Sequence, residues 1–373
     1  MILQTGVRTL DRVRSETLRR LLVVPAVRRA YTDRAWRLAI LHVLFACGAL
    51  LFALSFPFWQ LLLGPALFGY AHLISTVRNV PAAVQHLPRA NGLGRKVMGL
   101  TLAAGATHVL YRFALDAGWI ANSALQQSEW QGVGVIDGLF VAAVCLGFSM
   151  LLGLSVMASA WRFLLLTPLV LALGLAPMHT AGALILLHNL VGYVYWIAIA
   201  QSVKDRKSGA ISLLSVLVVS GLILSGTLDA MLPTHSGEWL RSVTGLSLQS
   251  IGQSILPANT DPIVWARLVC AFAFGQSCHY FVWLKAIPET RQRKRAPHTL
   301  SNCLRAMERE FTPDSAHVVV YAIGISILLW VFVAVPDMRR FYFLVAAFHG
   351  LVELAGLPHL LPFSSARRLE KQE

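Results

Sequence analysis

Charged residues are scarce in this sequence, and the short motifs of common soluble enzymes are missing from it. Asp, Glu, Lys and Arg together make up only 13% of the 373 residues, far less than in a soluble domain. The sequence contains no HExxH, GxSxG, Walker-type, GxGxxG or DDxxD segment. These absences argue against ATP-driven transport and the common hydrolase mechanisms.

Paired cysteine motifs are also absent. The five cysteines include no CxxC pair. Four of them (Cys47, Cys145, Cys270 and Cys278) fall in long apolar segments, where cysteine behaves as a small apolar side chain. The sequence therefore predicts neither a disulfide framework nor a thiolate metal site.

Apolar residues dominate the chain instead, at 56% of the sequence with a mean hydropathy of +0.62. About 20 apolar residues in a helix cross the ~30 Å hydrocarbon core of a bilayer. Segments near this length recur at 38–58, 59–77, 97–115, 133–157, 163–178, 180–200, 211–232, 263–284, 316–336 and 341–362. We therefore predict an all-α protein, a polytopic transmembrane helix bundle of about ten spans.

The basic residues predict how this bundle is oriented. Of the 32 Lys and Arg residues, 27 fall before the first span or in alternate connections after it. The exceptions are Arg112, Arg241, Arg267, Arg339 and Arg340. This asymmetry predicts cytoplasmic N- and C-termini in a bacterial-type inner (plasma) membrane. The net charge of +14 is then explained by membrane topology and by contacts of the basic residues with lipid headgroups. We therefore expect membrane lipids, and no nucleic acid, as partners.

The N-terminal segment has a pattern of its own. Val7, Leu10, Leu18 and Leu21 recur at roughly helical spacing among many arginines. This pattern is typical of a helix lying on an anionic membrane surface, although a solvated basic tail fits as well, and we expect no cleavable signal peptide. We divide the chain into a basic amphipathic cytoplasmic segment (1–36), a transmembrane helical domain (37–363) and a cytoplasmic tail (364–373).

Histidines are the notable polar residues of the apolar segments, because eight of the ten predicted spans contain or adjoin one. Ionisable groups at bilayer depth usually mark a functional site. His349 and Glu353 are four residues apart and share one face of the last span, so they can chelate one ion. His72, His188 and His279 fall on three other spans that run in the same predicted direction, roughly 12 to 24 Å from their outer ends.

These residues form the predicted site. The metal ligands are His72, His188, His279, His349 and Glu353, with His108 and His359 as additional candidates, and the catalytic side chains are Tyr195 and Tyr280. Two further carboxylates near the outer side, Asp137 and Asp229, are expected to pair with Arg112 or Arg267.

Histidines with one carboxylate suit iron, zinc, copper or manganese, and two histidines with one carboxylate are typical of non-haem Fe(II) oxygenases. A site within hydrocarbon suits a lipophilic substrate such as a carotenoid, an isoprenoid or a lipid acyl chain. We therefore expect an Fe²⁺ cofactor and an oxidative, oxygenase-like reaction.

Two short segments support this chemistry by resemblance. Gly356-Leu357-Pro358-His359 and Cys278-His279-Tyr280-Phe281 resemble parts of the Brp/Blh family of membrane β-carotene dioxygenases. The resemblance implies iron held by histidines of separate helices and cleavage of a carotenoid or isoprenoid. It covers only these two segments, and here Leu360 follows the GLPH sequence where the family has glycine.

Three other hypotheses remain open at this point. The same histidines can be axial ligands of a haem, a proton or solute site of a transporter, or hydrogen-bonding residues that join the helices of a scaffold subunit. The sequence does not predict the oligomeric state.

Overall fold

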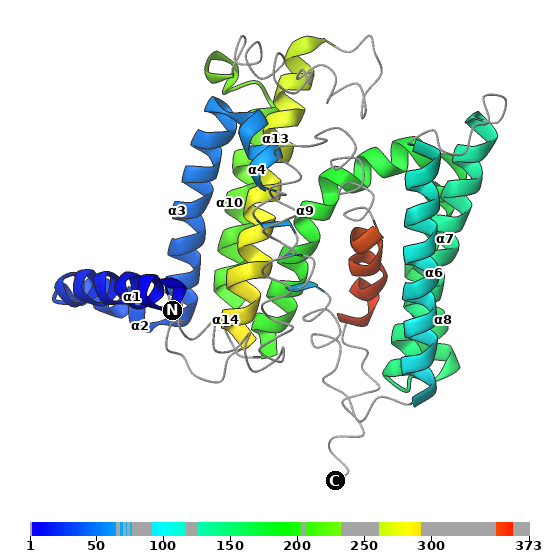
Figure 1. Ribbon diagram of the computed structural model, residues 1–373, viewed down its shortest axis with the longest axis horizontal. Coiled ribbons are helices and arrows are strands. Elements are labelled where there is room, and N and C mark those ends of the chain that lie inside the picture. The colour runs from blue at the N-terminus through cyan, green and yellow to red at the C-terminus, as the bar shows by residue number, and fades with distance from the viewer. Residues whose placement is uncertain are drawn as a thin grey trace.

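The regular secondary structure of the described residues is helical throughout (Figure 1). The computed structural model describes residues 2–64, 68–69, 72, 75–76, 92–116, 126–202, 206–232, 261–291 and 348–360. No strand occurs within these ranges, which confirms the all-α prediction for them.

In chain order the helices are α1 (Ile2–Leu21), α2 (Pro25–Thr32), α3 (Arg34–Ser55), α4 (Pro57–Gly64), α6 (Gly92–Asp116), α7 (Gln126–Leu151), α8 (Val156–Leu175), α9 (Pro177–Ser202), α10 (Arg206–Leu224) and α13 (Pro262–Phe281). From α3 onward they follow the apolar segments of the sequence, whereas α1 and α2 lie in the basic N-terminal segment. A π-helix, η3 (Val282–Ala286), continues α13 into α14 (Ile287–Arg291). Residues 348–356 form another helix, and the 3₁₀ turn η4 (Leu357–Leu360) follows it.

Within the described part of the chain, four helical stretches are long and apolar enough to cross a membrane. They are Arg34–Ser55, Gly132–Leu151, Val156–Leu175 and Lys207–Leu224. Each corresponds to a predicted span. The predicted span 316–336 lies outside the described residues, as does the first part of 341–362.

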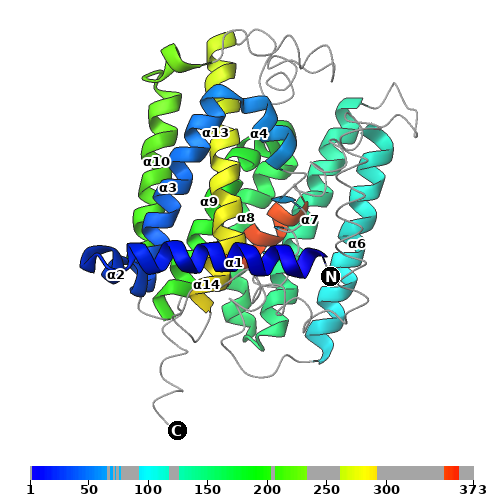
Figure 2. The same ribbon diagram turned by 60° about the vertical axis from the view of Figure 1, so that its left-hand side comes forward.

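The helices form two groups (Figures 1 and 2). In the first group α13 packs against α3, α4, α9 and α10, and in the second α7 packs against both α6 and α8. Helix 348–356 lies between the groups in Figure 1. It contacts the second group where Phe348 stacks on Phe140 of α7, with ring centroids 4.8 Å apart.

The central helix α13 is largely buried, whereas the peripheral helices expose apolar side chains. The α13 side chains between Val269 and Tyr280 are almost all buried. The outer helices instead expose apolar residues, including Leu44 (64% exposed), Leu164 (55%) and Leu214 (62%). A bundle with apolar side chains both inside and outside is typical of a protein surrounded by lipid.

Two predicted spans run six or more residues past the end of their helices, and a glycine follows each helix end. The predicted span 133–157 ends earlier, because α7 stops at Leu151 and Gly153 adopts a left-handed φ of 62°. The Ser155 side chain then caps α8 by accepting a hydrogen bond from the Ala158 N–H. The predicted span 211–232 likewise ends as a helix at Leu224, before Gly226 with a φ of 84°.

Candidate metal centre

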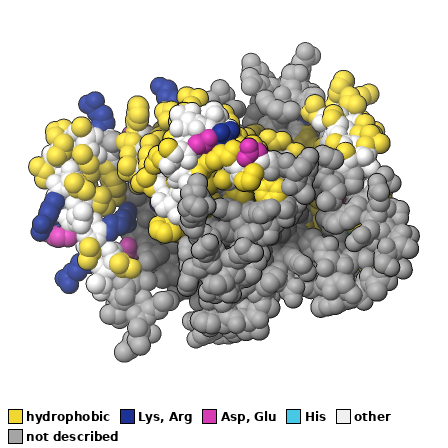
Figure 3. Space-filling view, turned by 90° about the horizontal axis from the view of Figure 1, so that it is seen from above, with side chains coloured by type: hydrophobic (Ala, Val, Ile, Leu, Met, Phe, Trp, Pro, Cys, Tyr) yellow, Lys and Arg dark blue, Asp and Glu magenta, His cyan; other side chains and the backbone are white. Residues whose placement is uncertain are grey.

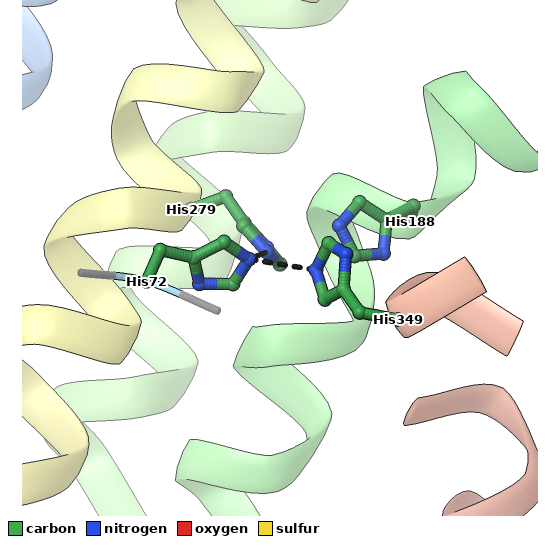
Figure 4. A group of neighbouring side chains, drawn as sticks. All are labelled: His72, His188, His279 and His349. Carbon is green, nitrogen blue, oxygen red and sulfur yellow. Dashed lines mark hydrogen bonds between the residues drawn. The ribbon is translucent and has the colours of Figure 1, made fainter. Parts of the chain in front are cut away.

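Four histidines from four separate segments meet at one point, with their rings directed toward one another (Figure 4). His188 comes from α9, His279 from α13 and His349 from helix 348–356, whereas His72 follows α4 in the sequence. One ring nitrogen from each histidine lies within 4.8 Å of those of the other three. We call this set the histidine cluster.

The ring nitrogens of the cluster face one another. The Nε2 atom of His72 lies 2.8 Å from Nε2 of His349 and 3.2 Å from Nε2 of His279. The His188 ring lies beside the rings of His279 and His349, at centroid distances of 4.4 Å and 4.7 Å. Because a hydrogen bond needs one donor and one acceptor, each close nitrogen pair shares at most one proton, and the other nitrogen presents its lone pair.

The outer nitrogens of two cluster members face oxygen acceptors. Nδ1 of His279 lies 3.3 Å from the main-chain oxygen of Asn189, and Nδ1 of His72 lies 3.5 Å from the Thr76 hydroxyl. A proton on Nδ1 directs the lone pair of the same ring to Nε2, which points into the cluster. Histidines that bind metals usually donate their other N–H to such a group.

Glu353 lies at the edge of the histidine cluster and is fully buried. Its Oε2 is 3.4 Å from Nδ1 of His188 and its Oε1 is 3.7 Å from Nε2 of His349, while the Thr76 hydroxyl donates to Oε1 at 3.0 Å. Its oxygens therefore contact two histidines without joining the set of mutually close ligand atoms. The sequence predicts Glu353 as a full metal ligand, and that role remains a prediction.

The cluster fits one metal ion in both spacing and burial. Metal–nitrogen bonds of about 2.0–2.1 Å separate neighbouring ligand nitrogens by about 2.8–3.4 Å. The two Nε2 separations around His72 fall in this range. His72, His279 and His349 are each less than 7% exposed, and the His188 side chain is 16% exposed. Several nitrogen lone pairs that converge in so apolar a place make the cluster a possible site for a metal cation.

The π-helix next to the cluster explains how the His72 segment is held. In η3 the Ile287 N–H donates to the Val282 carbonyl, five residues back. The carbonyl of Trp283 is thereby available and accepts a hydrogen bond of 2.6 Å from the Ser75 hydroxyl. π-Helical turns are frequent at functional sites. Here the turn joins the His72 segment to the helix that carries His279.

The two predicted catalytic tyrosines lie around the cluster rather than within it. The Tyr195 hydroxyl donates to the main-chain oxygen of Glu353 at 2.8 Å, which fixes helix 348–356 against α9. The Tyr280 hydroxyl accepts a bond of 2.9 Å from Gln276, and its ring centroid is 5.5 Å from that of His72. Their catalytic role remains a prediction.

The structure does not bring the two additional histidines to the cluster. His108 of α6 pairs with Asp137 of α7 at 3.0 Å. His359 lies in η4, where its Nε2 is 3.1 Å from the Ser149 hydroxyl. His359 lies away from the cluster because helix 348–356 ends before it. Pro358 is part of the 3₁₀ turn that follows this helix, so His359 does not continue the helical face of His349.

The outer carboxylates are both paired. Asp229 binds Arg267, as expected, whereas Asp137 binds His108. The side chain of Arg112, the other expected partner, lies outside the described residues.

Three supporting residues were not part of the predicted site: Ser75, Thr76 and Asn189. The position of Thr76, one turn after His72, offered a signal for a side-chain contact. No sequence pattern predicts that this hydroxyl also bonds Glu353, because the pair is 277 residues apart in the chain.

Comparison of the chain with family models, curated proteins and solved structures finds no match. The geometry of the histidine cluster is therefore the basis for the function proposed below.

Proposed function

We propose that the histidine cluster binds one divalent metal ion, with Fe²⁺ as the favoured metal, and that the protein is a multi-pass membrane oxidoreductase. Its proposed substrate is a lipophilic molecule such as a carotenoid, isoprenoid or acyl lipid. The observation that carries this proposal is the convergence of four histidines from distant parts of the chain within 4.8 Å. Helix-joining histidines have no reason to direct their ring nitrogens to one point.

The ligand set favours non-haem iron over haem. A porphyrin supplies four nitrogens and leaves two axial positions, so four converging histidines exceed what haem needs. Four imidazoles and a nearby carboxylate are also a hard to borderline set, as iron, manganese or zinc prefers.

The protein side chains have distinct roles in this proposal. The four histidines bind the ion, Asn189 and Thr76 orient two of them, and Glu353 offsets part of the positive charge. A bound Fe²⁺ ion would supply redox and dioxygen chemistry. The buried surroundings exclude water, and the apolar outer surface of the bundle lets a lipophilic substrate approach from the bilayer.

Metal analysis of the purified protein tests the ligand set. We expect about one metal ion per chain and no haem absorbance. His72→Gln and His279→Gln should lose the metal, whereas the matched variants His108→Gln and His359→Gln should retain it. Gel filtration identifies any variant that fails to fold. Equal trace metal in all five proteins would contradict the proposal and leave the transporter and scaffold hypotheses.

Oxygen uptake tests the reaction class. Iron-loaded protein in nanodiscs should consume oxygen when a carotenoid, isoprenoid or unsaturated lipid is added, and His72→Gln protein should not. Stoichiometric metal without uptake on any of these substrates would keep the metal site and contradict the oxygenase assignment.

A further inference from the structure

The N-terminal helix α1 carries an apolar face that the bundle leaves open. Leu10, Val13 and Leu21 lie on one side of this helix, within about 80° of one another. They are 62%, 59% and 49% exposed. Arg12 and Arg19 lie on the opposite side and are exposed as well. The helix is therefore amphipathic in the structure, with an apolar side that stays largely uncovered.

Side-chain contacts set the direction of this segment. Arg14 of α1 donates to the Tyr31 hydroxyl of α2 at 3.2 Å, and the Tyr31 main-chain oxygen accepts from Arg37 of α3. Arg37 in turn pairs with Glu289 of α14 at 2.6 Å, and both side chains are buried. These bonds connect α1 and α2 to the helices of the first group.

The segment runs across the end of the bundle. In Figures 1 and 2, α1 extends sideways from the lower end of α3, at a steep angle to it. Seen from above in Figure 3, the projection at the left formed by α1 and α2 shows many apolar side chains, with arginines around its margin. This view looks along α3, which is a candidate membrane span. The apolar side of the projection thus faces the layer that α3 would cross.

We propose that α1 and α2 dock onto the anionic leaflet of the membrane in which the bundle is embedded. Leu10, Val13 and Leu21 enter the boundary between headgroups and acyl chains, and the arginines bind lipid phosphates. Residues 1–37 contain nine arginines and only three acidic residues, so charge complementarity favours an anionic lipid surface as the partner. This surface is independent of the histidine cluster.

Cysteine labelling of the full-length protein in nanodiscs tests the proposal. Val13→Cys and Ser15→Cys place a thiol on opposite sides of α1, and Ser15 provides a near-isosteric control on an exposed position. Both are made in a Cys47→Ala, Cys303→Ala background, because Cys145, Cys270 and Cys278 are buried. The rate of reaction with a membrane-impermeant maleimide is the readout.

In nanodiscs that contain phosphatidylglycerol, we expect Val13→Cys to react on the order of tenfold more slowly than Ser15→Cys. The difference between the two labelling rates should be smaller in pure phosphatidylcholine. It should also be smaller in high salt, which screens the charges of the arginines. Equal rates with phosphatidylglycerol would overturn the proposal. Protection of Val13→Cys that is the same without anionic lipid would also overturn it, because the arginines would then have no part in docking. The pattern should persist with His72→Gln, since it does not depend on the metal.

Discussion

Glu353 shows how one buried carboxylate connects several parts of the site. It shares helix 348–356 with His349, contacts His188 of α9 and accepts a hydrogen bond from Thr76. Its own main-chain oxygen accepts from Tyr195. A group with contacts on its own helix and on two other segments fixes the relative positions of the histidines and offsets part of their charge when they bind a cation.

Replacing Glu353 separates these two effects. Glu353→Gln keeps the size of the side chain and an oxygen for Thr76 but removes the negative charge beside His188 and His349. We expect metal affinity to fall by about 10- to 100-fold, as for other groups that support metal ligands. Competition with a chelator measures it. Unchanged affinity with a folded protein would mean that Glu353 has no part in metal binding.

Gly192 allows α9 to approach the cluster closely. A Cβ atom at this position would lie 2.9 Å from Nε1 of Trp283 and 3.2 Å from Nδ1 of His279. Trp283 is fully buried and cannot move aside freely. Gly192→Ala should therefore destabilise the protein by about 1–3 kcal/mol and lower its metal content by displacing His279.

Gly221 is the matched control, because a Cβ there meets no atom within 4 Å. Gly221→Ala should be neutral or stabilise α10 by about 0.5–1 kcal/mol. Thermal unfolding midpoints and metal analysis distinguish the two variants, and equal effects would refute the packing argument at Gly192.

At the scale of elements, the continuous helix α13–η3–α14 has two functions. Its middle carries His279, and its end carries Glu289, which accepts from both Arg37 and Lys285. Burial raises the pKa of Glu289, but the hydrogen bonds and charges of Lys285 and Arg37 outweigh it and leave this pKa below its usual value. The ion pair thus joins the start of α3 to the helix that holds the cluster.

This ion pair makes stability depend on pH in a defined direction. Because the pKa of Glu289 is lower in the folded protein than the usual value of about 4.3, its contribution is complete at neutral pH. It declines below about pH 4.3 and disappears as the pH falls through the folded pKa. Glu289→Gln leaves Arg37 buried without its carboxylate and should cost about 3–5 kcal/mol at pH 7.

Thermal unfolding midpoints of the wild type and of Glu289→Gln, measured from pH 8 to pH 3, give this contribution. The difference between the two midpoints should decrease only at the acidic end of this range. Glu16→Gln is the control, because Glu16 pairs with Arg19 at 3.9 Å on an exposed surface and should have almost no effect. A difference that is constant over the whole range would contradict an ionic contribution from Glu289.

For the whole molecule, the distribution of basic residues leads to a prediction about topology. If the chain has an even number of spans, about ten as predicted, both termini should lie on the cytoplasmic side. Green fluorescent protein fused to either end should fluoresce in bacterial cells, and alkaline phosphatase at the same positions should be inactive. Active phosphatase at one end only would show an odd number of spans.

The sequence predicted the helical class and the four candidate membrane helices of the described residues, because both depend on local composition. It missed the break at Gly153, since hydropathy averaged over a window does not register one residue with a left-handed backbone. It ranked His108 and His359 below the four cluster histidines, as additional candidates, but did not exclude them. All six lie in apolar segments, and only the packing of the helices decides which rings meet.

The sequence by itself determined that this chain is helical, apolar and rich in histidines at membrane depth, because hydropathy and charge act residue by residue. Only the tertiary structure decided that His72, His188, His279 and His349 share one point, with Glu353 beside them. The reason is physical. Their separations along the chain reach 277 residues, and such contacts depend on how helices cross, which glycines allow close approach and which carbonyls a π-helix makes available.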